Sequence, residues 1–296
     1  MTIKTVVVAG AGVLGSQIAF QNAYHGKQVW VYDIKDEFLD RAKGNMEHYQ
    51  TIYSNYFQTP EQAKDALTRL HYTTDLKQAV ADADLVIEAV PEVLTIKQNL
   101  FKQLGELAPE NTILATNTST MLPSQFAEIS GRPEKVLALH FANEIWLYNT
   151  AEIMGQAKTS PELIDEVVAF AREIGLIPIR LNKEQPGYVL NTMIMPLLDS
   201  AMYLWVNGIS DPQTIDKDWM ISTKMGMGPF GMLDMIGMRT QYDVLLHRIE
   251  MGETQLQPLA DRVKKEFIDQ NKLGISTGEG FYHYPSPAFM NPNFLR

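Results

Sequence analysis

The chain has 296 residues, of which 45% are hydrophobic and 20% charged, a composition typical of a soluble globular protein large enough for two domains. Its net charge of −10 argues against non-specific nucleic-acid binding, and the absence of cysteine excludes disulfides and cysteine-held metals. No apolar run reaches the roughly 18 residues that a membrane-spanning helix needs, and no signal segment precedes the first predicted strand. We therefore expect a cytoplasmic protein with no membrane partner, no nucleic-acid partner and no metal site.

A predicted strand followed by a glycine-rich turn opens the chain. The β-branched run at residues 3–8 is typical of a strand buried on both faces, and glycines follow it with the spacing G-x-G-x-x-G. Gly10 allows a sharp turn, Gly12 allows the backbone to approach a pyrophosphate, and Gly15 allows the next helix to pack closely on the sheet. That helix opens at Ser16–Phe20 and directs its N-terminal N–H groups at the phosphates. Val13 and Leu14, between the second and third glycines, are also expected to contact the cofactor.

A second predicted strand, Gln28 to Tyr32, ends in Asp33, eighteen positions after Gly15. A carboxylate at this place accepts hydrogen bonds from the ribose hydroxyls of an adenine dinucleotide. The alternative is an ordinary strand–turn–helix with a solvated aspartate. Because Asp33 would repel a 2′-phosphate and no arginine directly follows it, the pattern favours NAD over NADP.

Strand and helix patterns then alternate as far as residue 181. Two helices are predicted first, at Asp36–Tyr53 and Pro60–Leu70, as a helical hairpin at about residues 36–72 that projects from the sheet. Further strands are predicted at Ala83–Val90, Thr112–Thr116, Lys135–Leu139, Thr150–Met154 and Leu176–Leu181. Pro178 places the last of them at an edge or at an irregularity of the sheet. This alternation predicts an α/β fold with a mostly parallel, doubly wound sheet.

Beyond the sheet region the patterns are helical. The predicted helices are Tyr188–Val206, Pro212–Thr223, Pro229–Glu250 and Pro258–Asn271. We place the domain boundary near Glu184, giving domains at 1–184 and 185–296. Methionines such as Met193, Met202 and Met235 could line a substrate tunnel, although such residues more often fill a helical core or a subunit interface.

Polar residues follow several of the predicted parallel strands, at the sheet edge where doubly wound proteins bind ligands. His140 is the one histidine that ends a buried strand there, and imidazole suits the base that takes a hydroxyl proton during alcohol oxidation. Glu152 can orient this imidazole if the two strands pair as a hairpin, whereas Glu144 in the connecting loop is the alternative. Ser119 ends another strand at the same edge.

The sequence resembles the L-3-hydroxyacyl-CoA dehydrogenase family over nearly its whole length. The matching pieces are Gly10–Gly15, Asp33, Glu88–Glu92 with Lys97, Thr116–Ser119, His140–Phe141 with Asn143, Ala151–Ile153, Pro186–Asn191, Gly228–Phe230 with Asp234, and Thr277–Tyr282. The resemblance implies a Rossmann-type NAD-binding domain, then an all-helical domain that dimerises, with the active site between them. It also implies a role in fatty acid metabolism.

The resemblance further implies roles for individual side chains. His140 would act as base or acid and Glu152 would orient it. Ser119 and Asn191 would hydrogen-bond the substrate's oxygens. The residues expected to contact the cofactor beyond the glycine-rich turn and Asp33 are Glu92, Lys97 and Asn117.

Two departures from the family pattern concern the substrate. The proline that usually follows the asparagine of the His-Phe motif is replaced by the loop Glu144–Trp146, which we expect to narrow the pocket next to His140 and favour short acyl groups. In addition, residues 44–63 of the hairpin contain no lysine or arginine, although the family holds the polyanionic CoA with serine and lysine there.

Three explanations of the missing hairpin cations remain open. The flanking Lys43, Lys64 and Arg69 could substitute for them. CoA could instead be held by backbone groups and by stacking on an aromatic residue of the hairpin; the candidates are Tyr53, Tyr56 and Phe57. Alternatively, the CoA site has been lost.

The leading hypothesis is an NAD-dependent oxidoreductase that interconverts a short L-3-hydroxyacyl-CoA and the 3-ketoacyl-CoA. A dehydrogenase of a free 3-hydroxy acid or polyol acid is the alternative, and an NAD-binding protein without turnover is a third hypothesis. The methionine- and aromatic-rich helical part, which includes Trp205 and Trp219, offers more apolar surface than a domain of about 110 residues readily buries. We therefore expect a homodimer.

Overall fold

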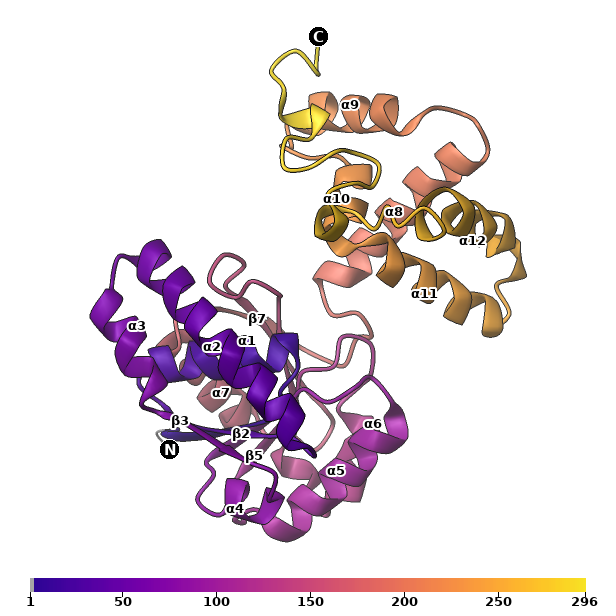
Figure 1. Ribbon diagram of the computed structural model, residues 1–296. Coiled ribbons are helices and arrows are strands. Elements are labelled where there is room, and N and C mark those ends of the chain that lie inside the picture. The colour runs from indigo at the N-terminus through magenta and orange to yellow at the C-terminus, as the bar shows by residue number, and fades with distance from the viewer. Residues whose placement is uncertain (1–2) are drawn as a thin grey trace. The chain divides into compact units, whose positions relative to one another are not determined.

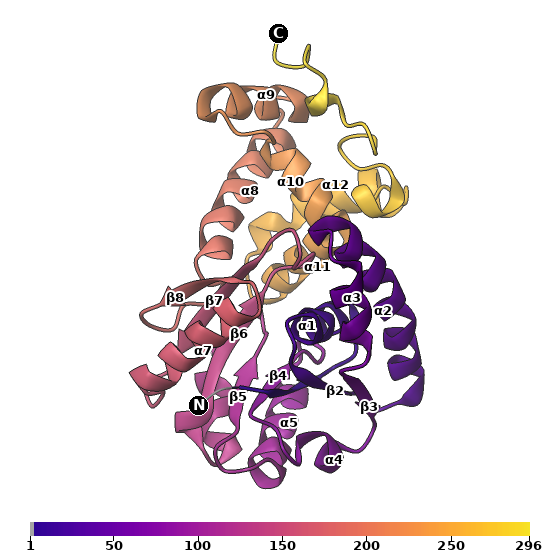
Figure 2. The ribbon, with the colours of Figure 1, turned by 90° about the vertical axis from the view of Figure 1, so that its left-hand side faces the viewer.

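The computed structural model describes residues 3–296 (Figures 1 and 2). The chain forms two compact units, residues 1–190 and residues 191–296. In the part of the chain that the structure describes, no helix is both long enough and apolar enough to cross a membrane.

The first unit is built on an eight-stranded sheet with the order β3-β2-β1-β4-β5-β6-β7-β8. Its strands are β1 Thr5–Ala9, β2 Gln28–Tyr32, β3 Leu70–Thr73, β4 Leu85–Glu88, β5 Ile113–Thr116, β6 Val136–Phe141, β7 Thr150–Gly155 and β8 Ile177–Leu181. Only β6 and β7 pair antiparallel; the other neighbouring strands are parallel. The predicted mostly parallel sheet is confirmed, and the strand that contains Pro178 lies at its edge.

Helices cover both faces of the sheet, as Figure 2 shows. They are α1 Val13–Tyr24, α2 Asp36–Phe57, α3 Pro60–Leu67, α4 Leu76–Val80, α5 Leu94–Leu107, α6 Ser124–Ala127 and α7 Pro161–Glu173. Because side chains alternate along a strand, Val6 and Val8 of β1 join the core beneath α1, α2 and α7, whereas Val7 joins the core beneath α4, α5 and α6. All three valines are fully buried, which explains the unbroken β-branched run.

The hairpin region differs from its prediction in two ways. The helix predicted as Pro60–Leu70 ends at Leu67, and residues 70–73 form β3, which pairs parallel with β2. The hairpin also packs on α1 rather than projecting from the sheet: the ring of Tyr53 lies 4.8 Å from that of Phe20 and 5.0 Å from that of Tyr24. A four-residue strand directly after a helix has too few positions to show its alternation.

The second unit is helical, as predicted. Its helices are α8 Leu190–Val206, α9 Pro212–Thr223, α10 Pro229–Ile236, α11 Met238–Glu250 and α12 Gln257–Val263, the last continuing in π-helical form to Ile268. The helix predicted as Pro229–Glu250 is divided at Gly237, whose φ of +96° no helix accommodates. Met202 and Met238 are buried in the core of this unit, whereas Met193 and Met235 are exposed.

Candidate active site

The glycine-rich turn after β1 packs closely against the end of β4. Gly10 has a φ of +117°, and a Cβ there would lie 2.4 Å from the carbonyl oxygen of Ala89. A Cβ on Gly15 would lie 1.9 Å from the carbonyl oxygen of Gly10. At Gly12, in contrast, nothing lies within 4 Å of the Cβ position. The turn is therefore tight on its protein side and open at Gly12, which fits the close approach of a pyrophosphate.

Asp33 lies beside this turn, at the end of β2. Its Oδ2 accepts a hydrogen bond from the Ala11 N–H at 2.7 Å, and its Oδ1 accepts one from the Ile34 N–H at 2.7 Å. Two backbone donors thus fix the carboxylate next to the glycines. Carboxylate oxygens have further acceptor positions, so this placement fits hydrogen bonds from ribose hydroxyls.

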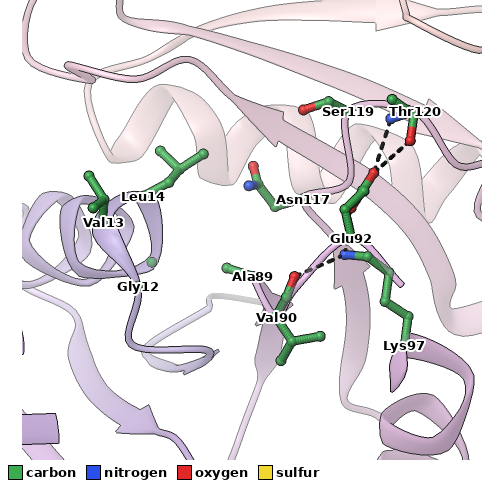
Figure 3. Close-up of a pocket in the computed structure, with 11 residues that line it drawn as sticks. Gly12, Val13, Leu14, Ala89, Val90, Glu92, Lys97, Asn117, Ser119 and Thr120 are labelled. Carbon is green, nitrogen blue, oxygen red and sulfur yellow. Dashed lines mark hydrogen bonds and ion pairs between the residues drawn. The ribbon is translucent and has the colours of Figure 1, made fainter. Parts of the chain in front are cut away.

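A cavity of about 260 Å³ begins at the same turn (Figure 3). It is lined by the start of α1 and by the segments that follow β4 and β5. Of the residues predicted to contact cofactor or substrate, its lining contains Gly12, Val13, Leu14, Gly15, Glu92, Lys97, Asn117 and Ser119. The structure therefore brings most of the predicted cofactor residues to one place, while Gly10 and Asp33 lie at the turn without lining the cavity.

Lys97 is buried below this cavity and is held by protein groups. Its Nζ lies 2.6 Å from Glu88 Oε1 and 3.0 Å from Glu92 Oε2, and it donates to the Val90 carbonyl at 3.4 Å. Burial raises the pKa of Glu88, and its contacts with Lys97 and Thr116 oppose that rise. An ammonium group has three protons. These three contacts can take all of them and hold the Lys97 side chain beside Glu92, and its contact with the cofactor stays a prediction.

Glu92 projects into the cavity from the segment between β4 and α5 (Figure 3). It accepts hydrogen bonds from the Thr118 hydroxyl and, at 2.8 Å, from the Thr120 hydroxyl. Burial disfavours its charged form, but the bonds from Thr118, Lys97 and Thr120 outweigh burial and lower the pKa of Glu92. The cavity thus holds an ionised carboxylate. Thr118 and Thr120 were not among the predicted residues.

His140 and Glu152 are direct cross-strand partners in the antiparallel pair β6–β7. His140 Nδ1 lies 3.0 Å from Glu152 Oε2, and Nε2 lies 3.1 Å from Ser119 Oγ. The structure therefore unites these three predicted residues. Glu144 is exposed in the connecting loop, and its N–H donates to Gln17 Oε1 at 2.7 Å.

The second oxygen of Glu152 is also held. Oε1 accepts hydrogen bonds from the N–H groups of Val189 and Leu190, at 2.9 and 3.2 Å. Burial alone would raise the pKa of Glu152, but the bond to His140 and the two backbone donors outweigh it and lower that pKa. An ionised Glu152 favours the imidazole tautomer with its proton on Nδ1, which leaves Nε2 able to accept a proton.

Tyr188, for which the sequence pattern predicted no role, contacts the same imidazole. Its ring is stacked on that of His140, with centroids 4.5 Å apart and planes 13° apart. Its hydroxyl donates to the carbonyl oxygen of Thr118 at 2.7 Å. The available signal was weak: an aromatic residue after Pro186–Gly187, within a segment predicted as helix.

The loop Glu144–Trp146 packs against the hairpin through the ring of Trp146. Ile145 is fully buried, and the ring of Trp146 lies 6.0 Å from that of Tyr49 and 5.9 Å from that of Tyr53. The proposal that Tyr53 stacks on CoA is wrong, because Tyr53 has no exposed surface and hydrogen-bonds Gln21. The neighbouring aromatic residues of the hairpin that are exposed are Tyr56 and Phe57.

Asn191 directly follows Leu190 and is the first residue of the second compact unit. Its contact with substrate therefore rests on the family resemblance alone and stays a prediction.

Family models account for nearly the whole chain. Residues 5–185 match the 3-hydroxyacyl-CoA dehydrogenase NAD-binding domain, and residues 187–284 match the C-terminal domain of the same enzymes. The chain belongs to the 3-hydroxyacyl-CoA dehydrogenase family. It is thus an oxidoreductase of an NAD-dependent family, and its cofactor is NAD.

Individual relatives of this family member differ in the substrates that their names give. A probable 3-hydroxybutyryl-CoA dehydrogenase of Deinococcus radiodurans is 36% identical over 279 residues, which are 94% of this chain and 99% of that protein. The solved structure of a diketoreductase that acts on dicarbonyl compounds is 49% identical, with a TM-score of 0.92 and coverage of 96% of this chain and 100% of that one. A 5-formyl-3-hydroxy-2-methylpyridine 4-carboxylate 5-dehydrogenase of Mesorhizobium japonicum is 29% identical over 95% of this chain and 91% of that protein.

Proposed function

We propose that this dehydrogenase interconverts a 3-hydroxy carbonyl compound and the corresponding 1,3-dicarbonyl compound, and that it does so without requiring CoA. In the reduced compound the hydroxyl is a secondary alcohol on the β-carbon of a carboxylate, an ester or a ketone. The observation that carries the proposal is the absence of any lysine or arginine from residues 44–63, where the resemblance to the family implies cations that bind CoA. The 49% identity to a diketoreductase that acts on dicarbonyl compounds supports the same substrate class.

The surroundings of the hairpin support this proposal. Of the flanking cations, Lys43 pairs with Asp40 at 3.0 Å and Arg69 donates to the Ala23 carbonyl at 3.2 Å. These two of the three flanking cations have protein partners, with which an anion would have to compete. A CoA phosphate would therefore meet a hairpin with few cations on a chain of net charge −10.

In the proposed reaction, His140 Nε2 takes the proton of the substrate hydroxyl as the carbon–hydrogen bond breaks. Bound NAD supplies the hydride acceptor. The imidazolium that forms keeps its Nδ1–H on Glu152, whose negative charge stabilises it. Ser119 Oγ, 3.1 Å from Nε2, donates to the developing ketone oxygen, and Asn191 is a second candidate donor. In the reverse direction His140 returns the proton to the alkoxide oxygen.

A CoA thioester remains the second candidate substrate, because the Deinococcus relative is named for 3-hydroxybutyryl-CoA. A side-by-side assay with NADH separates the two. We expect acetoacetate or its ethyl ester to be reduced with a kcat/KM at least equal to that of acetoacetyl-CoA, and with little dependence on salt. Preference for the thioester would contradict the proposal. A thioester KM that rises with ionic strength would then indicate the flanking cations, and a salt-independent KM would indicate stacking on Tyr56 or Phe57.

His140→Gln is the control in this assay. It should lose turnover of every substrate while it still binds NAD. An NAD-binding protein without turnover, the third hypothesis, predicts that the wild-type chain reduces none of the three compounds.

We also propose that the helical domain, placed at residues 185–296, forms a homodimer, and that the protein is cytoplasmic. The dimer is supported by large apolar side chains exposed on the second unit, among them Tyr203, Ile209 and Met251.

A further inference from the structure

We infer that Tyr188 is a positioning residue for the acid–base pair, fixing the face of the His140 imidazole while Glu152 and Ser119 fix its two nitrogens. This inference rests on the proposed role of His140 in proton transfer. It assigns to Tyr188 a function beyond filling space, and it makes the segment before α8 part of the site.

The stacking restricts the motion that the two hydrogen bonds leave free. Bonds at Nδ1 and Nε2 both lie in the plane of the imidazole, so they resist tilting out of that plane only weakly. The phenol ring of Tyr188 is nearly parallel to the imidazole, at 4.5 Å and 13°, and its side chain is 1% exposed. Tilting the imidazole would push its edge into this ring. Tyr188 therefore keeps Nε2 directed at Ser119.

The hydroxyl of Tyr188 holds a second part of the site. It donates to the Thr118 carbonyl at 2.7 Å, and Thr118 directly precedes Ser119. The Thr118 hydroxyl is bonded to Glu92, which lines the cavity, so the same segment contacts the cavity carboxylate as well. One side chain thus fixes both His140 and the peptide that carries Ser119.

The backbone conformation at Tyr188 also indicates that this position requires the tyrosine side chain. Tyr188 has a φ of +53°, in the left-handed region, directly after Gly187 with a φ of +77°. Glycine would adopt this conformation with less strain, so a tyrosine there indicates that its side-chain contacts outweigh the strain. The same bend directs the N–H groups of Val189 and Leu190 at Glu152 Oε1.

The stacked ring also affects the charge that His140 carries during the reaction. The face of a phenol ring bears partial negative charge and attracts a cation that lies over it. His140 becomes imidazolium when it takes the hydroxyl proton. Tyr188 therefore stabilises the charged form of the acid–base group, in addition to Glu152.

Three substitutions separate these effects. Tyr188→Phe keeps the ring and removes the bond to Thr118. Tyr188→Leu removes the ring, and Tyr188→Met removes it with a flexible side chain that fills the space in case the leucine variant does not fold. Tyr24→Phe and Tyr24→Leu are matched controls, because Tyr24 is also buried and hydrogen-bonded, to Thr59, and lies on α1.

The readouts are kcat, the KM values for both substrates and the pH profile of kcat/KM for alcohol oxidation. We expect Tyr188→Phe to lose roughly 3- to 10-fold in kcat with an unchanged pH profile. Tyr188→Leu and Tyr188→Met should lose at least about 10-fold in kcat, with little change in the KM for NAD. Without the aromatic face, the acidic limb of the kcat/KM profile should move to lower pH by about half a unit in Tyr188→Leu and Tyr188→Met.

Two results would overturn the inference: a loss of activity no larger than in the matching Tyr24 variants, or an acidic limb that stays in place in both ring-free variants. His140→Gln, assayed alongside, separates this inference from the proposed function. If His140→Gln is inactive and Tyr188→Met behaves as wild type, only the role of Tyr188 fails. If His140→Gln stays active, the proposed acid–base role itself fails.

Discussion

His140 and Glu152 face each other across two antiparallel strands, and their side chains meet with Nδ1 3.0 Å from Oε2. This pairing occurs at the one antiparallel junction of an otherwise parallel sheet, where β6 turns back as β7. A cross-strand pair has Cβ atoms only about 5 Å apart, so the contact follows from strand register alone. The contact between His140 and Glu152 is therefore set by two paired strands of the sheet.

The first prediction concerns this pair. His140→Gln should lower kcat on the order of 100-fold or more while the Kd for NAD stays within about two-fold, because the variant lacks a group that exchanges a proton at neutral pH. Glu152→Gln should lose less, since it still contacts the imidazole but no longer stabilises its charged form. Steady-state kinetics and a titration with NAD measure both. Near-full turnover by His140→Gln would show that another group accepts the proton.

Asp33 should set the choice between NAD and NADP. Backbone N–H groups hold its carboxylate beside the glycine-rich turn, where it would accept from ribose hydroxyls and repel a 2′-phosphate. We expect wild type to have a far higher kcat/KM with NAD, and Asp33→Ala to reduce that preference by weakening NAD use more than NADP use. Comparable kcat/KM values for the two cofactors in wild type would contradict this role.

The sequence predicted those parts of the fold that local patterns specify. Buried β-branched runs place the inner strands within a few residues, because parallel strands covered on both faces are continuously apolar. β3 was not predicted, because four residues soon after a helix are too few to show the apolar–polar alternation of a strand. The division of the predicted helix at Gly237 depends on a backbone conformation that periodicity does not reveal.

The site was predictable to a similar extent. Glu152 could be inferred because an antiparallel pairing of two short strands brings it opposite His140. The stacking of Tyr188 on His140 could not be inferred, because it depends on a left-handed bend between β8 and α8. The direction of Trp146 likewise depends on tertiary contacts with Tyr49 and Tyr53.

The second unit should associate as a symmetric dimer. Its exposed apolar side chains include Tyr203 and Ile209, each 60% exposed, and Met251, 75% exposed. Large exposed apolar patches mark protein–protein interfaces, and we propose that these side chains belong to one. Light scattering at micromolar concentration should give twice the mass of one chain. A monomer mass would contradict the proposed dimer.

His25 should make the free energy of unfolding depend on pH below neutrality. It caps the C-terminal end of α1, its ring contacts Tyr24, and a Cβ on Gly175 would lie 2.7 Å from its Nε2. Burial, and then the nearby charge of Lys27, lowers the pKa of His25 to about 4, from 6.5 for a free imidazole. Between these values the unfolded chain binds the proton more readily than the folded chain.

The sign of the effect follows from this difference. The contribution of His25 to stability is fully present above pH 6.5 and is lost as the pH falls toward 4. The shift alone corresponds to roughly 3 kcal/mol, but partial exposure and the helix C-terminus, which favours a cation, reduce this to about 1–2 kcal/mol. Urea unfolding at several pH values between 7.5 and 4.5 measures it. His25→Asn, which stays neutral and caps a helix end, should lose less stability than wild type across that range. The exposed His48→Asn should keep the wild-type dependence, and an equal dependence in His25→Asn would contradict the assignment.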